Sequence, residues 1–229
     1  MRLRFNYFTP DDFYEAAVAK FVTRNCNWLD VGCGRHVFPS NPQLARILAD
    51  RCALLVGVDP DATVKENAFV HQRVNSSVED YRCDQAFDLV TLRMCAEHVA
   101  DPDRAVAALS RLTKPGGKVI IYTINRWSPV PIITWLVPFR LHHPFKRVLW
   151  KTEEKDTFPV SYLMNTRKEL SRLFQRHDFR EFHFAYLDDC RTTSRFWVGQ
   201  LVELVSWKFL KIVGLKYPEN CLLGIYVSL

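Results

Sequence analysis

Three residues near position 30 and one near position 60 are of the types that bind a nucleoside. Asp30, Gly32 and Gly34 lie in or just after a short apolar run, and Asp59 ends the next apolar run. A Gly-x-Gly turn lets the backbone approach a ligand because no side chain stands in the way. A carboxylate such as that of Asp59 can accept hydrogen bonds from two ribose hydroxyls. This spacing indicates a cradle for a nucleoside.

The residue at position 37 argues against a dinucleotide. NAD and FAD sites require a third small residue three positions after the second glycine, where a helix packs closely on a strand beneath the pyrophosphate. This chain has Val37 at that position. We therefore expect a nucleoside ligand without a pyrophosphate.

Strands and helices alternate along the chain and can position these residues. Asn41-Pro42 and Asp101-Pro102 each combine an N-cap residue with a proline at the first helical position. The alternation predicts an α/β fold, a Rossmann-like, doubly wound, mostly parallel seven-stranded sheet with helices on both faces. The expected strands lie near 28–31, 53–58, 71–74, 87–92, 118–124, 182–187 and 222–228. The expected helices cover 9–25, 42–50, a short stretch after Asp61, 102–113, 166–177 and 196–215, and residues 114–117 are expected to form a turn.

The 229 residues fit a single domain with three parts. Residues 25–125 are expected to form the ligand-binding core. Residues 126–165 contain a stretch rich in proline and large apolar residues, which we interpret as an inserted cap over the mouth of the sheet. Residues 166–229 supply a helix, the last strands and an inserted apolar helix.

Composition excludes several classes of protein. Apolar residues make up 48% and charged residues 24%, which is typical of a globular chain, and the basic residues behind the net charge of +6 are scattered. The seven cysteines include no C-x-x-C pair, so we expect no metal site. Reduced thiols, the lack of a signal peptide and the lack of a long apolar run predict a cytoplasmic protein without a membrane span.

Six short segments together resemble class I S-adenosylmethionine-dependent methyltransferases. The likeness is to the broad group that includes the ubiquinone and menaquinone biosynthesis methyltransferases, and it covers residues 25 to 125. The segments are Leu29–Gly34, Gly57–Asp59, Ser77–Asp80, Phe87–Val90, Glu97–Pro102 and Leu112–Gly117.

This resemblance implies S-adenosylmethionine as the cofactor and assigns its contacts. Gly32 and Gly34 would line the methionine and ribose side, with Asp30 near the methionine ammonium. Asp59 would hold the ribose hydroxyls. The remaining candidates are Ser77, Val78 and Glu79 at the adenine edge, with Asp80 or a backbone amide as alternatives to Glu79, and Arg93 at the methionine part.

A methyl transfer to oxygen needs a group that accepts the hydroxyl proton, and His98 is the candidate base because it follows the fourth strand. The alternative interpretation is that Glu97-His98 packs or caps a helix; His142, His143 and His183 are weaker candidates. We expect O-methylation of a small-molecule or lipophilic acceptor. N- or C-methylation of a small metabolite, or a non-catalytic S-adenosylmethionine-binding partner subunit, remain alternatives.

The chain lacks the features of a nucleic-acid methyltransferase. Residues 93–96, Arg-Met-Cys-Ala, stand where base-flipping enzymes carry an Asp/Asn-Pro-Pro-aromatic loop, so no nucleic-acid partner is expected. Residues 127–150 and 196–215 carry many aromatic and apolar side chains with basic residues among them. Most of these are expected to pack as core, yet the pattern also fits a lipid-like acceptor and peripheral membrane contact.

Overall fold

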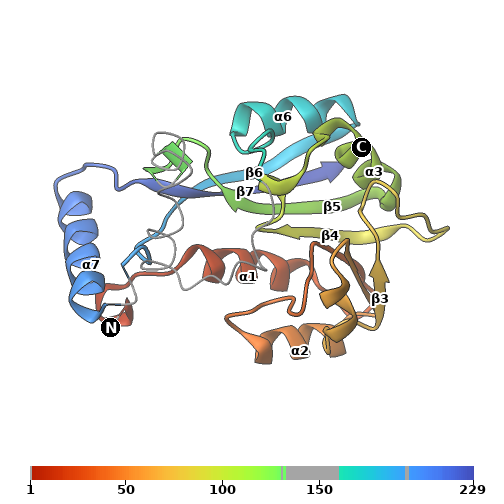
Figure 1. Ribbon diagram of the computed structural model, residues 1–229, viewed down its shortest axis with the longest axis horizontal. Coiled ribbons are helices and arrows are strands. Elements are labelled where there is room, and N and C mark those ends of the chain that lie inside the picture. Colours follow the sequence, from red (N-terminus) through yellow and green to blue (C-terminus); the bar gives the residue numbers. More distant parts are fainter. Residues whose placement is uncertain (1, 130, 133–159, 194–195) are drawn as a thin grey trace.

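The computed structural model describes residues 2–129, 131–132, 160–193 and 196–229 (Figure 1). One seven-stranded sheet has the order β3-β2-β1-β4-β5-β7-β6. Strands β1 to β5 are parallel, and β7 pairs antiparallel with both β5 and β6. The expected α/β architecture is confirmed. The strands are β1 Asn27–Val31, β2 Leu54–Asp59, β3 Gln72–Asn75, β4 Phe87–Arg93, β5 Thr113–Ile124, β6 Phe179–Asp188 and β7 Glu219–Ser228.

Helices cover both faces of the sheet. Viewed edge-on, α6 lies on one side of the sheet and α1 and α2 lie on the other (Figure 1). Two buried apolar clusters match these layers, one involving α3 and α6 and the other involving α1 and α2. The helices are α1 Pro10–Phe21, α2 Pro42–Arg51, α3 Pro102–Leu112, α6 Arg167–Arg176 and α7 Trp197–Ile212, with short 3-10 helices η1 Arg2–Phe5, η2 Ala62–Glu66 and η3 Ala96–His98.

Side-chain caps fix where the helices begin. The side chains of Asn41 and Asp101 accept backbone N–H bonds at the starts of α2 and α3, as their positions before proline predict. Thr9 and Asp12 form a reciprocal capping box at the start of α1. These capping residues therefore determine the residue at which each of the three helices begins.

Two expected boundaries differ by four or more residues in the structure. The first helix ends at Phe21 rather than near residue 25, because Val22 turns to an extended conformation and buries its side chain. The expected turn at 114–117 lies inside β5 as an irregularity. Thr113 pairs with Phe87 and Lys118 pairs with Leu89, so four residues oppose one, and Lys114 Nζ bonds both carboxylate oxygens of Asp88 at 2.9 Å.

Helix α7 lies at the edge of the sheet where the parallel strands end. It connects the end of β6, which runs parallel to β5, with the start of the antiparallel β7. Figure 1 shows α7 at one end of the molecule beside the N-terminus. Most of the expected cap, including residues 133–159 with His142 and His143, lies outside the described residues, so the division of the chain into core and cap stays a prediction.

Candidate functional site

The turn after β1 leaves its backbone open on one side. Gly32 and Gly34 adopt φ values of +69° and +45°, which favour glycine. A Cβ on Gly32 would lie 2.6 Å from Cβ of Cys95, so no larger residue fits there. A Cβ on Gly34 would meet no atom within 4 Å. The missing side chain of Gly34 therefore faces space that a ligand can enter.

Asp59 is fixed beside this open space. Its Oδ2 accepts the backbone N–H of Gly34 at 2.8 Å, and its Oδ1 accepts the backbone N–H of Asp61 at 2.8 Å. The residue is 9% exposed. Because a carboxylate oxygen can accept more than one hydrogen bond, each oxygen keeps an acceptor position. Such a carboxylate can therefore accept hydrogen bonds from two neighbouring hydroxyls of a ligand.

Asp30 is a buried acid beneath the glycine turn. Its Oδ1 accepts the hydroxyl of Thr91 at 2.7 Å, and Thr91 in turn accepts the indole N–H of Trp28 at 2.7 Å. Burial raises the pKa of Asp30 to about 7, against the effects of Thr91 and Arg93. A cation bound nearby would favour the ionised form, which is consistent with a place near an ammonium group.

The adenine-side candidates differ in how their side chains are used. Val78 is buried in the core. The hydroxyl of Ser77 donates to Asp80 Oδ2 at 3.0 Å and accepts the backbone N–H of Asp80, so both side chains take part in a local turn. Asp80 also pairs with Arg104 at 3.6 Å. Of the two acidic residues in this segment, half-buried Glu79 is the better candidate for a ligand contact.

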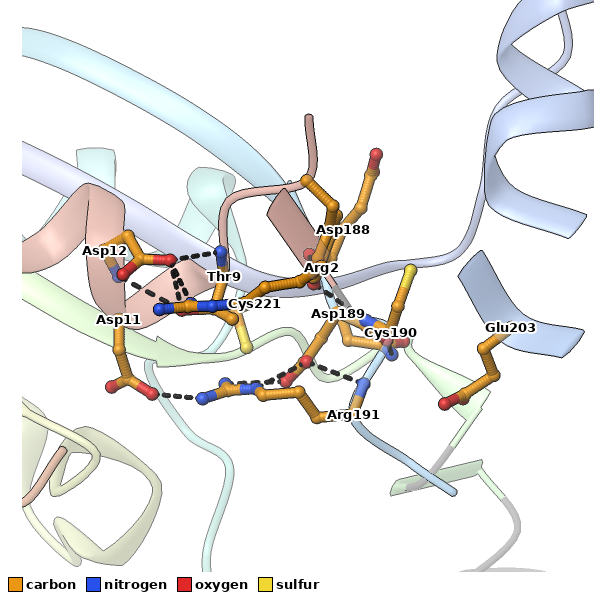
Figure 2. A network of polar contacts seen from close by, with 12 residues as sticks. Arg2, Thr9, Asp11, Asp12, Asp188, Asp189, Cys190, Arg191, Glu203 and Cys221 are labelled. Atoms are coloured by element: carbon orange, nitrogen blue, oxygen red, sulfur yellow. Dashed lines mark hydrogen bonds and ion pairs between the residues drawn. The ribbon is translucent and has the colours of Figure 1, made fainter. Parts of the chain in front are cut away.

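Arg93 pairs with Asp11, a residue that the sequence did not single out as part of the site. Its Nη2 lies 2.8 Å from Oδ1 of Asp11, in the first turn of α1. The other oxygen of Asp11 pairs with Arg191 (Figure 2). Burial alone would raise the pKa of Asp11, but the two guanidinium groups outweigh it and hold the pKa below its usual value. In the sequence, Asp11 had only the features of a helix start.

Arg191 extends this network across the end of the sheet. It bonds both carboxylate oxygens of Asp189, at 2.7 and 2.8 Å (Figure 2). Its Nη2 also lies 3.4 Å from the hydroxyl of Tyr122. Asp11 and Arg191 also line a pocket of about 310 Å³, together with Arg2, Glu15, Asn41 and Gln200. Ion pairs therefore connect the first turn of α1 to the end of β4 and to the segment that follows β6.

His98 lies in η3 and is half-buried, with its backbone N–H donating to the carbonyl of Cys95 at 3.0 Å. Its neighbour Glu97 is 3% exposed and accepts the hydroxyl of Thr123 at 2.7 Å. The carbonyl of Glu97 also accepts the backbone N–H of Ser161 at 2.7 Å. Glu97 thus connects β5 to the segment that begins at residue 160, while the base role of His98 stays a prediction.

Comparison with known proteins identifies the family. Residues 5–182 match the family described as a methyltransferase domain. The chain belongs to this methyltransferase family. A ubiquinone biosynthesis O-methyltransferase of Photorhabdus laumondii is 39% identical over 106 residues, which cover 43% of this chain and 42% of that enzyme. The match thus spans less than half the length of this curated relative.

Solved structures show the same methyltransferase fold over nearly the whole chain. A putative S-adenosylmethionine dependent methyltransferase from Listeria monocytogenes has a TM-score of 0.60 at 13% identity, covering 96% of this chain and 97% of its own. The geranyl diphosphate C-methyltransferase from Streptomyces coelicolor has a TM-score of 0.57 at 14% identity, covering 94% of this chain and 76% of its own. At these identities the likeness shows the fold alone.

The described residues fit S-adenosylmethionine, the cofactor of this family. Gly34 faces open space, Asp59 keeps acceptor positions beside it, and Asp30 is a buried acid beneath the turn. The expected family, fold class and cofactor are confirmed, whereas the individual contacts stay predictions. Among the residues that the structure describes, no group of His, Cys, Asp or Glu is arranged to hold a metal ion.

Proposed function

We propose that this methyltransferase transfers the methyl group of S-adenosylmethionine to an oxygen of a small, lipophilic acceptor. The observation that carries the cofactor part of the proposal is the position of Asp59, whose carboxylate accepts the N–H of Gly34 beside open space. That arrangement suits the vicinal hydroxyls of a nucleoside. Gly32 and Gly34 would line the methionine and ribose side, Asp30 and Arg93 the methionine end, and Ser77, Val78 and Glu79 the adenine edge.

The chain's own task is to orient two reactants and exclude water. When bound, the cofactor supplies a methyl carbon that an acceptor oxygen attacks in line, with the carbon–sulfur electron pair leaving on sulfur. Asp59 and the glycine turn would fix the nucleoside. The first turn of α1, held by Arg93 and Arg191, would shield the methionine end. His98 would take the proton from the acceptor hydroxyl.

Oxygen is favoured as the methylated atom because the curated relative from Photorhabdus laumondii is named as an O-methyltransferase. Its match covers less than half of either chain, so the acceptor is inferred by relationship. The Streptomyces coelicolor neighbour is named as a C-methyltransferase of geranyl diphosphate, which keeps carbon as the alternative. One name refers to the biosynthesis of ubiquinone and the other to geranyl diphosphate, and both compounds carry an apolar isoprenoid chain, which supports a lipophilic acceptor here.

The proposal also includes the cellular compartment of the protein and its contact with a membrane. All seven cysteines are free, and five of them are buried, which supports a reducing, cytoplasmic compartment. No helix in the described part of the chain is long and apolar enough to cross a membrane. A lipophilic acceptor partitions into bilayers, so we include peripheral contact of residues 196–215 with a membrane.

Calorimetric titration with S-adenosylmethionine tests the cofactor site. We expect saturable binding to the wild-type protein and at least a ten-fold loss in the Asp59→Asn variant, because the amide replaces one hydroxyl acceptor by a donor. Glu66→Gln, an exposed acid on η2, is the matched control. Wild-type protein that does not bind, or equal binding by Asp59→Asn, would contradict the assignment.

Catalysis is tested separately from binding. Mass spectrometry of a cell extract incubated with the protein and the cofactor should show a metabolite that gains one methyl group. Cofactor binding without turnover across a panel of phenol, amine and prenyl acceptors would favour the non-catalytic partner subunit.

A further inference from the structure

Helix α7 is apolar on the side that faces away from the protein. Its inner side buries Leu204 and Trp207, and the indole N–H of Trp207 donates to Asp188 at 2.8 Å. A surface helix normally exposes polar residues on its outer side. Here the side chains that recur every three or four residues on that side are each exposed by at least half: Val198, Val202, Val205, Phe209 and Ile212. We call these five residues the outward face.

The five residues of the outward face have the spacing of a helix-pair seam, but the exposed apolar surface extends beyond them. Trp197 is 69% exposed at the start of α7, and Val213 and Leu215 continue the apolar surface at its end. The 3-10 helix η1, which contacts α7, adds the exposed Leu3. A strict seam between two helices occupies a narrower stripe. The breadth of this surface suits a continuous apolar phase better than a single partner helix.

Basic residues border this apolar surface. Lys208 and Lys211 are exposed on α7, and Lys216 follows in the next loop with 84% of its side chain exposed and its Nζ 3.2 Å from Oε1 of Glu219. Nζ of Lys208 lies 5.7 Å from the ring centre of Phe5, and Nζ of Lys211 lies 4.4 Å from that of Trp207, so both ammonium groups lie on the side of α7 that contacts η1 and flank the outward face. The one acid in α7, Glu203, accepts the backbone N–H of Thr193.

This combination points to an anionic lipid surface. Helices that lie in a membrane interface carry Trp, Phe and aliphatic residues on one face and lysines beside it. The apolar side chains can enter the acyl boundary while the flanking lysines reach lipid phosphates. We propose that the outward face of α7 docks the enzyme on an anionic bilayer, with the helix parallel to the membrane plane.

The position of α7 connects docking to the acceptor. Because Trp207 of the helix donates a hydrogen bond to Asp188 at the end of β6, α7 stands at the edge of the sheet that carries Asp59, Arg93 and η3. Docking through α7 therefore brings this edge close to the bilayer. An amphiphilic acceptor, with its polar group at the interface and its apolar part among the acyl chains, would enter from there. The docking deepens the membrane contact that the proposed function includes, and this last step also rests on the proposed methyl transfer.

Vesicle co-sedimentation tests the docking. Wild-type protein is mixed with vesicles of phosphatidylcholine alone or of phosphatidylcholine with phosphatidylglycerol. We expect binding to the anionic vesicles that weakens as salt is raised. The double variant Val205→Glu/Phe209→Glu should lose at least about ten-fold in partitioning, because two charges enter the apolar surface. Ile47→Glu, an equally exposed apolar position on α2, should bind like wild type.

Two further measurements separate the outcomes. Circular dichroism and titration with S-adenosylmethionine show whether the double variant keeps its fold and its cofactor site. Wild-type protein that binds neither vesicle type, or a folded double variant that binds as well as wild type, would overturn the proposal. Sedimentation that shows a dimer dissociated by the double variant, without vesicle binding, would assign the surface to a second copy instead. Vesicle binding without cofactor binding would refute the proposed methyl transfer and leave the docking in place.

Discussion

Asp11 and Arg93 lie 82 residues apart in the chain, yet their side chains form a buried ion pair at 2.8 Å. The side chain of Asp11 is 6% exposed and that of Arg93 is 22% exposed. Since Arg191 occupies the second oxygen of Asp11, one carboxylate connects α1, β4 and the segment after β6. The first turn of α1 is thereby fixed over the edge of the sheet at which the candidate site lies.

The substitution Asp11→Asn should destabilise the protein strongly. It leaves two guanidinium groups that have little access to water without their shared negative charge, and removal of one partner from such a buried pair costs about 3 kcal/mol. Urea unfolding measures the loss. Glu66→Gln, which removes the partner of Arg35 at an exposed site, should cost less than about 1 kcal/mol. Equal effects of the two substitutions would show that the buried pair contributes no more than a surface one.

How much of this arrangement could be predicted depends on how local each signal is. The prolines after Asn41 and Asp101 set the starts of α2 and α3 within a few residues, so sequence reasoning located them. The Gly32-x-Gly34 turn and Asp59 were predicted because each follows directly from the end of a strand. The pairing of Asp11 with Arg93 and Arg191 depends on how α1 packs against β4 and β6. No pattern of neighbouring residues contains that information.

Asp30 should make stability and cofactor binding depend on pH. Its folded-state pKa of about 7 lies above the unfolded value of about 4, so the folded protein prefers the protonated form. The contribution of Asp30 to the free energy of unfolding is therefore full below about pH 4 and is lost as pH rises to about 7. Asp30→Asn should remove this slope, which urea unfolding across the pH range measures for both proteins.

The carboxyl group of Asp30 should also make the affinity for the cofactor depend on pH. An ammonium placed near Asp30 favours the ionised carboxylate, so the affinity for S-adenosylmethionine should rise as pH increases toward and through about 7. In Asp30→Asn the affinity should be lower and nearly constant over this range. A parallel rise in both proteins would mean that another group causes it.

Gly34→Ala should weaken cofactor binding at least ten-fold while the fold survives. The residue has φ of +45°, and the added Cβ meets no protein atom within 4 Å, so the direct cost is backbone strain of about 1 kcal/mol. A methyl group in that space would collide with a nucleoside bound by Asp59, and calorimetry should show at least a ten-fold loss. Gly116→Ala is the matched control, since Gly116 has φ of +76° and the same open surroundings in β5. A similar loss of affinity in both variants would place the ligand elsewhere.

His98→Ala separates a catalytic role from a structural one, because its neighbour Glu97 already serves the fold through Thr123. If His98 takes the acceptor proton, the variant should lose about 100-fold in turnover, while its affinity for S-adenosylmethionine changes little. The loss should be largest for hydroxyl acceptors of high pKa and small for acceptors already ionised in solution, since those need no base. Glu97→Gln should behave in the opposite way, lowering stability by about 1 kcal/mol with a smaller effect on turnover. Stopped assays with a weakly acidic and a strongly acidic phenol measure the difference. Equal slowing of both phenols would assign His98 to packing around η3 rather than to proton transfer.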